Sequence, residues 1–366
     1  MSSEYERYFN FSAGPAALPL PCLQEAQRDL VCYPNAGASV LELSHRGKVI
    51  DGIIKEAEAR LRRILNVPEG YHVLFLQGGA TTQFSMVPMN FLGEGGAVYI
   101  EQGTWSKKAM AEAKRVGKVE VAWSDKENNF KRIPTDDEYE VRADADYFHI
   151  TSNETIHGVE FHRDPKANGV PLVCDASSDF LGRPIDITKY GLVYAGAQKN
   201  IGPAGVTVVI ISDKFYAKLI EDEKRPIMMN YKTHVDNKSL YNTCPVFSIY
   251  MVGLVLKWLE EQKGGIEGIY KENLAKAELL YKAIDNSNGF YTGHAEVNSR
   301  SIMNVTWRTP SDDLDKEFAN EGAARHMLGL KGHRSVGGVR ASIYNATSIE
   351  AVQALVEFMD EFRKKH

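Results

Sequence analysis

The residue with the clearest chemical potential is a lysine in a turn of small residues. Lys199 stands in the segment AGAQKNIGPAG at 195–205, between the apolar runs 192–194 and 206–211. A lysine that is partly desolvated, or that lies near other cations, keeps a neutral amine and can form a Schiff base with a carbonyl compound. The same segment also suits an exposed loop lysine whose glycines only allow tight turns. The segment alone leaves both interpretations open.

An aspartate upstream favours the chemical interpretation. Asp175 follows the apolar run 171–174, and a buried carboxylate is costly there without a cationic partner. The protonated ring nitrogen of a pyridine cofactor is such a partner, and the ion pair would keep the ring strongly electron-withdrawing. The alternative is a helix N-cap, because Ser177 and Ser178 follow. An N-cap does not account for the lysine downstream.

Two further segments could hold a flat, phosphorylated cofactor. Residues 77–82 read QGGATT directly after an apolar run, and free backbone amides at the start of a helix favour a phosphate group. Trp105, which follows the next apolar run, could stack on a flat ring. A tight connection and a core tryptophan are the simpler explanations for these two segments when each is taken alone.

Cationic residues stand near both ends of a chain whose net charge is -5. They are His45 and Arg46, then His333 and Arg334, and finally Arg340. An arginine can grip a carboxylate or phosphate through two parallel hydrogen bonds, and a neighbouring histidine adds another donor. Scattered surface charge would explain either His-Arg pair alone. The glycines beside them favour an anion-binding site.

These residues need a scaffold, and apolar runs of strand length indicate one. The runs at 73–76, 97–100, 119–123, 147–150, 172–174, 192–194 and 206–211 are largely apolar at successive positions, which is typical of strands buried on both faces of a parallel sheet. Helical patterns follow at 246–262, 270–284 and 348–363, with short strands around 301–307. We therefore predict an α/β protein with a large α/β/α domain, a mostly parallel sheet and a small α+β domain. The predicted boundaries are an arm over 1–18, a large domain over 19–265 and a small domain over 266–366.

Composition excludes several classes of protein. With 366 residues, 43% of them hydrophobic and 25% charged, the chain is expected to fold into a compact protein of two domains. Its acidic balance argues against nucleic-acid binding, and no apolar run approaches the ~20 residues that cross a membrane. The first residues lack a signal-peptide pattern, and the four cysteines lack metal-site spacing. We predict a cytoplasmic protein that binds no metal.

The order of these segments resembles the fold-type I, class V aminotransferases, and within that family the branch that acts on phosphoserine. The segments are NFSAGPA at 10–16, SHR at 44–46, GG at 78–79, NETIHG at 153–158, QKNIGPAG at 198–205, GHR at 332–334 and GGVRASIYNA at 337–346. The match runs along nearly the whole chain. It implies a homodimer that uses pyridoxal 5′-phosphate to exchange 3-phosphohydroxypyruvate and glutamate with phosphoserine and 2-oxoglutarate, in serine biosynthesis.

The resemblance also implies a role for each motif residue. Lys199 would carry the cofactor as a Schiff base, Asp175 would pair with its ring nitrogen, and Trp105 would stack on the ring. The phenolic oxygen of the cofactor would bond Thr155. The cofactor phosphate would bind Ala80, Thr81 and Gln198, together with Asn242 and Thr243 of the other subunit. Arg340 would grip the substrate α-carboxylate, with Ser12 nearby. The distal phosphate or carboxylate would bind His45, Arg46, His333 and Arg334.

Four alternatives fit these residues less well. Another class V aminotransferase would share Lys199 and Asp175, and the distal anion cluster distinguishes this chain from it. A cysteine desulfurase needs a mobile nucleophilic cysteine, and none of the four cysteines lies in an evident flexible loop. A binding protein built on a retired enzyme scaffold would have no need to keep Lys199, Asp175 and Trp105 together. A dinucleotide-dependent dehydrogenase would extend Gly78-Gly79 to a G-x-G-x-x-G pattern with an acidic residue ~20 positions later. The sequence shows no such extension.

Overall fold

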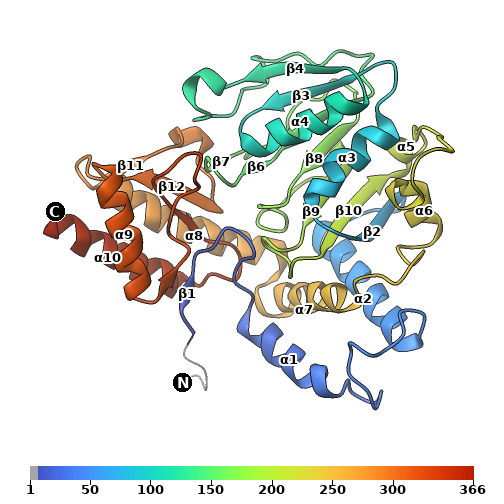
Figure 1. Cartoon of the computed structure of the whole chain (residues 1–366), viewed down its shortest axis with the longest axis horizontal. Helices are drawn as coiled ribbons and strands as arrows, with labels where there is room; N and C mark the ends of the chain where they lie inside the picture. Colours follow the sequence, from blue (N-terminus) through green and yellow to red (C-terminus); the bar gives the residue numbers. More distant parts are fainter. Residues whose placement is uncertain (1–6) are drawn as a thin grey trace.

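A mostly parallel sheet forms the centre of the protein. The computed structural model describes residues 7–366, and within them the largest sheet has seven strands in the order β2-β10-β9-β8-β5-β3-β4 (Figure 1). The strands are β2 (Tyr71–Gln77), β3 (Ala97–Glu101), β4 (Val119–Ser124), β5 (Tyr147–Thr151), β8 (Leu172–Asp175), β9 (Tyr190–Gly196) and β10 (Val206–Ser212). Strand β10 is antiparallel to both neighbours, whereas the other pairings are parallel. The predicted α/β class is confirmed, and each of the seven predicted runs lies in one of these strands.

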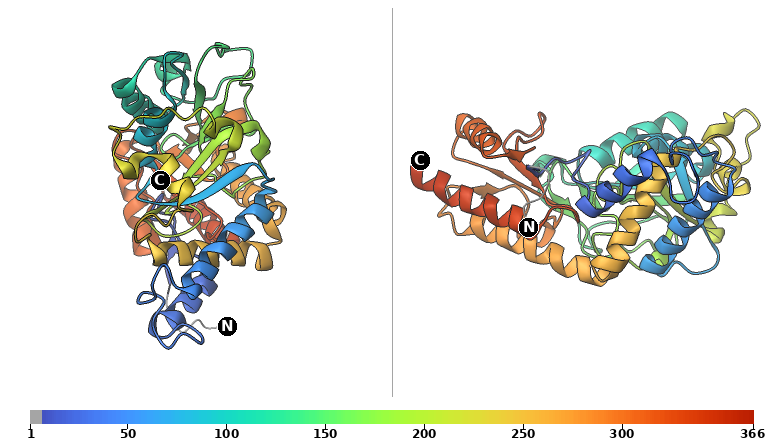
Figure 2. Two further views of the ribbon diagram at one scale, coloured as in Figure 1. Left: turned by 90° about the vertical axis from the view of Figure 1, so that its right-hand side faces the viewer. Right: turned by 90° about the horizontal axis from the view of Figure 1, so that it is seen from below.

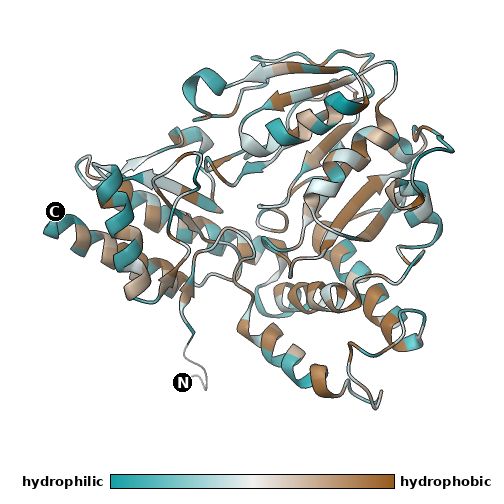
Figure 3. Ribbon diagram, in the orientation of Figure 1, coloured by the Kyte–Doolittle hydropathy of each residue, from teal (hydrophilic) through white to brown (hydrophobic). Residues whose placement is uncertain are grey.

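Helices cover both faces of the sheet because its strands are apolar on both faces. In β2, Val73 and Phe75 belong to one hydrophobic core, whereas Leu74 and Leu76 belong to another. The first core is completed by α1 (Leu20–Val31), α2 (Lys48–Leu65) and α7 (Val246–Gln262), and the second by α3 (Ala80–Phe91) and α4 (Thr104–Val116). Alternate residues of a strand therefore fill two cores. Figure 3 shows the apolar residues concentrated in strands such as β10 and in α7.

The C-terminal part of the chain builds a smaller unit to one side of this sheet (Figures 1 and 2). An antiparallel sheet of β11 (Thr292–Gly293), β12 (Asn304–Arg308) and β14 (Val339–Ser342) packs with α8 (Gly265–Asp285), α9 (Asp312–Ala324) and α10 (Ile349–Lys365). Their shared core contains Trp307, Phe318 and Phe358. These elements form the predicted α+β arrangement.

Helix α8 connects the two units without a break. The sequence pattern placed its start at residue 270, but the helix begins at Gly265, directly after Gly264 in the left-handed conformation (φ 71°). Ile269 packs into the core of the large unit, whereas Leu280 and Ile284 pack into that of the small one. The division of the chain at residues 265 and 266 stays a prediction.

The N-terminal segment joins the small unit to the turn that carries Lys199. Strand β1 (Phe9–Asn10) pairs in parallel with β13 (Met327–Leu328), and Phe11 is buried in the small core. Further along, the Ala16 amide donates a hydrogen bond to the Gln198 carbonyl at 3.0 Å. Residues 1–6 of the predicted arm lie outside the described residues. Within 7–366, no helix is both long enough and apolar enough to span a membrane.

Candidate active site

A pocket lies where the carboxyl ends of the parallel strands meet. Ligands bind at this edge in open α/β sheets because the loops after several strands converge there. Seven of the predicted cofactor-binding residues line the pocket, namely Ala80, Thr81, Trp105, Thr155, Asp175, Gln198 and Lys199. The lining also includes Gly79 of the predicted phosphate-binding segment, Ser177 and Ser178 of the N-cap alternative, and Phe84, Thr151 and Asn153, for which no role was predicted.

Asp175 presents a buried carboxylate that is only partly satisfied. Its Oδ1 accepts hydrogen bonds from the Ser177 backbone amide at 3.0 Å and from Ser177 Oγ at 2.6 Å. Burial raises the pKa of Asp175 to about 6, although the Ser177 bonds oppose the shift. Within residues 7–366 no side-chain cation forms an ion pair with it. The N-cap alternative explains the Ser177 bonds, but a turn follows rather than a helix, so it leaves the buried charge unexplained.

Lys199 has the environment of a reactive amine. It lies in the turn after β9, and burial lowers the pKa of Lys199 to about 8, assisted by the positive charge of Arg340. The N-terminal segment packs against it, because a Cβ on Gly14 would lie 2.9 Å from Lys199 Cδ and 3.4 Å from Nζ. Lys199 is therefore not an exposed loop lysine. Ser12 lies two residues before Gly14 and close to Gly329, and its role in substrate binding stays a prediction.

The start of α3 forms an open anion site on the same pocket. The helix begins at Ala80, and no side chain caps it at Gly79. Gly78 enters the turn with φ 99°, and its amide donates to the Gly205 carbonyl at 3.0 Å. The first amides of a helix lack partners within the helix and carry the positive end of its dipole. This end of α3 can therefore bind a phosphate group.

Trp105 is fixed by a glutamate whose role the sequence reasoning missed. The buried Glu154 carboxylate, on β6 (Asn153–Glu154), accepts hydrogen bonds from the Trp105 amide (3.1 Å), the Ser106 amide (2.7 Å) and Ser106 Oγ (3.0 Å). It thereby caps α4. A Cβ on Gly103 would overlap the Glu154 carboxyl, so only glycine fits there. Burial raises the pKa of Glu154 to about 7. An acidic residue inside a buried strand was the signal available in the sequence.

Arg340, on β14, places an unpaired cation beside the pocket. Its Nη1 donates to the Thr155 carbonyl at 3.4 Å, and its buried Nε has no partner among the described residues. Burial lowers the pKa of Arg340, and no carboxylate within 7–366 pairs with it. A largely buried guanidinium without an anion is costly. Arg340 is therefore suited to bind the carboxylate of a ligand.

The remaining predicted residues do not all meet at this pocket within one chain. His333 and Arg334 lie in the loop before β14, where burial and then the charges of Arg340 and Arg334 lower the pKa of His333. His45 and Thr243 instead line a separate hollow. Arg46 Nε donates to His45 Nε2 at 3.3 Å, and Asn242 Nδ2 donates to Gln77 Oε1 at 3.0 Å. The convergence of both His-Arg pairs in one pocket stays a prediction.

Pyridoxal 5′-phosphate fits the residues of this pocket. The cofactor carries an aldehyde, a ring nitrogen that takes a proton, a phosphate and a flat ring. Among the described residues, the pocket offers an amine of lowered pKa, a buried carboxylate that forms no ion pair, an uncapped helix start and a tryptophan ring. The nucleophilic cysteine of a desulfurase would line this pocket. Among the described residues, none of the four cysteines does so.

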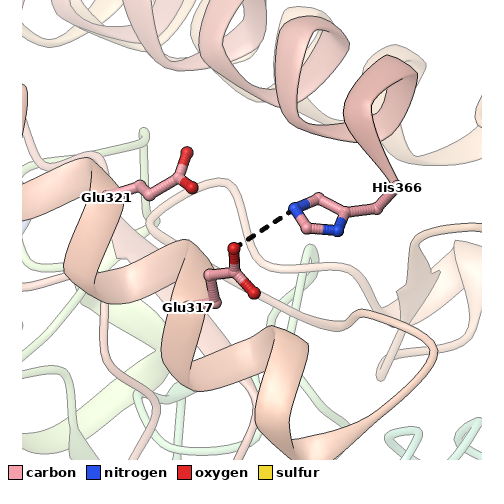
Figure 4. A group of neighbouring side chains, drawn as sticks. All are labelled: Glu317, Glu321 and His366. Carbon is pink, nitrogen blue, oxygen red and sulfur yellow. Dashed lines mark ion pairs between the residues drawn. The ribbon is translucent and has the colours of Figure 1, made fainter.

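A group of possible metal ligands lies on the small unit. It comprises Glu317, Glu321 and His366, whose ligand atoms lie within 4.8 Å of one another (Figure 4). The ammonium of Lys365 already pairs with Glu321 and, at 3.4 Å, with Glu317. His366 Nε2 lies 3.4 Å from Glu317 Oε1. We interpret the group as ion pairs between α9 and α10.

Comparison with known proteins agrees with this geometry. The family model described as aminotransferase class-V matches residues 8–355. A phosphoserine aminotransferase of Niallia circulans is 52% identical over 98% of this chain and 99% of its own length. A solved phosphoserine aminotransferase from Bacillus circulans subsp. alkalophilus is 51% identical, with a TM-score of 0.96 over 99% of both chains.

A further solved relative is a PLP-bound phosphoserine aminotransferase from Trichomonas vaginalis. It is 43% identical to this chain, with a TM-score of 0.91 over 97% of this chain and 100% of its own. The fold-type I architecture expected from the sequence motifs is confirmed by these structures. The matched family model spans nearly the whole chain, and the chain therefore belongs to the class-V aminotransferase family.

Proposed function

We propose that this protein is a pyridoxal-phosphate-dependent aminotransferase that interconverts 3-phosphohydroxypyruvate and glutamate with O-phosphoserine and 2-oxoglutarate, in serine biosynthesis. The observation that carries the proposal is one pocket lined by both Asp175, a buried carboxylate that forms no ion pair in the described chain, and Lys199, an amine of lowered pKa. Relatives that are 51–52% identical over nearly their full length bear the name phosphoserine aminotransferase and support the substrate.

Each pocket residue would have a separate role in this reaction. When bound, pyridoxal phosphate supplies an aldehyde for the amino group and a ring that withdraws electrons from the substrate Cα. Asp175 would hold the ring nitrogen protonated, because its buried carboxylate is stabilised by a cation. Lys199 would attach the cofactor through Nζ and, when released, move the proton taken from the substrate Cα. Trp105 would cover the ring and exclude water.

The polar groups at the pocket edge would bind the anionic ends of cofactor and substrate. The amides at Ala80 and Thr81, with Gln198, would hold the cofactor phosphate, and Thr155 its phenolic oxygen. Arg340 would grip the substrate α-carboxylate, because its guanidinium has no partner carboxylate in the described chain.

A second copy of the chain is part of the proposal. His45 and Thr243 share one hollow away from Lys199, and a homodimer would bring this surface, with Arg46 and Asn242, to the pocket of its partner. Dilution to monomer should then release cofactor, and a cofactor-loaded, active monomer would refute the arrangement. The cytoplasmic location is proposed too, supported by the four free cysteines.

The substrate assignment is tested with three amino donors. Purified protein is assayed with phosphoserine, glutamate and alanine, and kcat/KM is compared. Charge-assisted hydrogen bonds contribute about 1.5 to 3 kcal/mol each, so Arg334→Ala should lower kcat/KM for phosphoserine at least ~10-fold and leave cofactor absorbance unchanged. A wild type that prefers alanine would refute the phosphoserine assignment and leave the aminotransferase chemistry intact.

A further inference from the structure

Two buried asparagines beside the pocket have no role in the proposed reaction. Asn200 directly follows Lys199 in the turn after β9, and Asn345 lies just after β14, the strand of Arg340. Their exposed fractions are 7% and 3%, and neither side chain lines the pocket. The Asn345 amide donates a hydrogen bond to Asn200 Oδ1 at 2.9 Å. One buried bond therefore joins the turn that carries Lys199 to the segment that follows Arg340.

The side chains of both asparagines also bind one turn of the large unit, at 177–182, which follows β8 and Asp175. Asn200 Nδ2 donates to the Phe180 carbonyl at 2.8 Å. Asn345 Nδ2 donates to the Leu181 carbonyl at 2.8 Å. Leu181 is buried and has φ 60°, a conformation that residues with a Cβ adopt only where their surroundings hold them. The segments of Asp175, Lys199 and Arg340 therefore meet at these two side chains.

Helix α8, which connects the two units, holds the segment of Asn345 as well. Asn273 Nδ2 donates to Asn345 Oδ1 at 2.8 Å and to the Gly182 carbonyl at 2.9 Å. On the same face of α8, Lys276 Nζ donates at 2.7–3.0 Å to the carbonyls of residues 343, 344 and 347. Both polar atoms of the Asn345 side chain thus have buried partners. A satisfied buried network favours a single arrangement of the groups that it joins.

We propose that Asn200 and Asn345 form a positioning pair that fixes where Arg340 lies relative to Lys199. The inference rests on the proposed function, because the roles of Lys199 and Arg340 belong to it. Lys199 would act on the substrate Cα, and Arg340 would bind the carboxylate attached to that carbon. These two groups have to be held at one separation, although they belong to different units of the protein. The pair lies outside the pocket and acts through its two neighbours.

Two matched variants separate positioning from stability. Asn200→Leu keeps the size of the side chain but removes the oxygen that accepts from the Asn345 amide. Asn90, at the end of α3, is also fully buried, and its Nδ2 donates to the carbonyls of Met86 and Met229 while its Oδ1 accepts a backbone amide. These partners all belong to the large unit. Both substitutions to leucine should therefore lower Tm, but only Asn200→Leu breaks a bond between the units.

The binding test uses glutarate, an unreactive dicarboxylate with the carbon skeleton of 2-oxoglutarate, and measures its Kd for the holoenzyme by calorimetry. Loss of a charge-assisted hydrogen bond weakens binding about 10-fold or more, so Asn200→Leu should raise the Kd of glutarate about 10-fold. The kcat for phosphoserine should fall at least ~10-fold, because a misplacement of about 1 Å can reduce a rate about 100-fold. The cofactor content per chain should stay that of wild type. Asn90→Leu should keep the wild-type Kd and kcat.

A second measurement reports the separation of Arg340 and Lys199 without turnover. The positive charge of Arg340 contributes to lowering the pKa of Lys199, whereas the charges of Asp175 and Glu154 raise it. Both carboxylates belong to the large unit, so their contribution should persist in the variant. In the holoenzyme, the absorbance of the cofactor changes when the nitrogen contributed by Lys199 takes up a proton. The pH midpoint of that change should rise in the first variant and stay unchanged in the control.

Asn200→Ala, which leaves a space instead of an apolar group, replaces Asn200→Leu if the latter does not fold, and the same results are expected of it. A folded variant with lowered Tm but wild-type glutarate affinity, kcat and pH midpoint would assign the pair to stability alone and overturn the inference. Equal losses in Asn90→Leu would overturn it too. Failure of the proposed function gives a different result, because wild type itself would then transfer no amino group from phosphoserine.

Discussion

Gly14→Ala should impair catalysis by displacing Lys199, in addition to its cost in stability. Gly14 adopts φ 147°, a conformation that residues with a Cβ rarely adopt, and its added methyl group would lie 2.9 Å from Lys199 Cδ and 3.2 Å from Cε. Carbon atoms pack at about 3.5 Å or more, so the lysine side chain has to move by about 0.6 Å. The amine that must attach the cofactor moves with it.

The substitution has two energetic consequences, one for the stability of the fold and one for the rate of catalysis. The backbone conformation costs about 1–3 kcal/mol when it is forced on alanine. The lysine side chain is flexible and can shift at little cost to stability, but its amine then loses its position. A misplacement of about 1 Å can reduce a rate about 100-fold, so a shift of about 0.6 Å should lower kcat at least ~10-fold.

The assay pairs turnover with thermal unfolding and uses a glycine control. Gly37 also has a positive φ, 67°, but a Cβ there meets nothing within 4 Å. Gly37→Ala therefore reproduces backbone strain without the contact, and it should lower Tm while keeping kcat within twofold of wild type. If Gly14→Ala retained wild-type kcat, or if both variants lost activity equally, the contact with Lys199 would not be what positions the amine.

Three other predictions concern charge. Burial lowers the pKa of Lys199 to about 8, so the neutral fraction of its amine falls as the pH decreases below 8. Cofactor uptake by the apoprotein, followed by absorbance, should therefore slow about tenfold per pH unit below that value. An uptake rate that does not change between pH 6 and 9 would contradict the lowered pKa. Glu154→Gln replaces one acceptor oxygen with an NH2 group, which leaves a single acceptor oxygen facing three donors. The variant should therefore destabilise the start of α4 by about 1–3 kcal/mol and weaken cofactor binding. A near-ultraviolet circular dichroism spectrum identical to that of wild type would argue against the cap. Lys276 Nζ donates at 2.7–3.0 Å to three carbonyls in 343–347, so Lys276→Met should lower the free energy of unfolding by about 3 kcal/mol or more in denaturant titrations. The exposed Lys282→Met on the same helix should change it by less than about 0.5 kcal/mol.

The sequence by itself determined the strands and the residues that follow them. Short runs that are apolar at successive positions are typical of strands buried on both faces of a sheet, and their alternation with helical patterns indicated the α/β class and the place of each strand. The carboxyl ends of parallel strands meet at one edge. Residues such as Asp175, Gln198 and Lys199, each at or just after a strand end, were therefore predictable as neighbours from local pattern and motif order.

The tertiary structure decided everything that depends on packing between distant segments. Gly14 meets Lys199, and Glu154 caps the helix of Trp105, across chain separations that no periodic pattern records. The start of α8 depended on backbone angles at Gly264 rather than on side-chain spacing. The separation of His45 from Lys199 in one chain is likewise a property of the fold. Burial, which sets the pKa of Lys199 and Asp175, exists only once these segments are assembled around them.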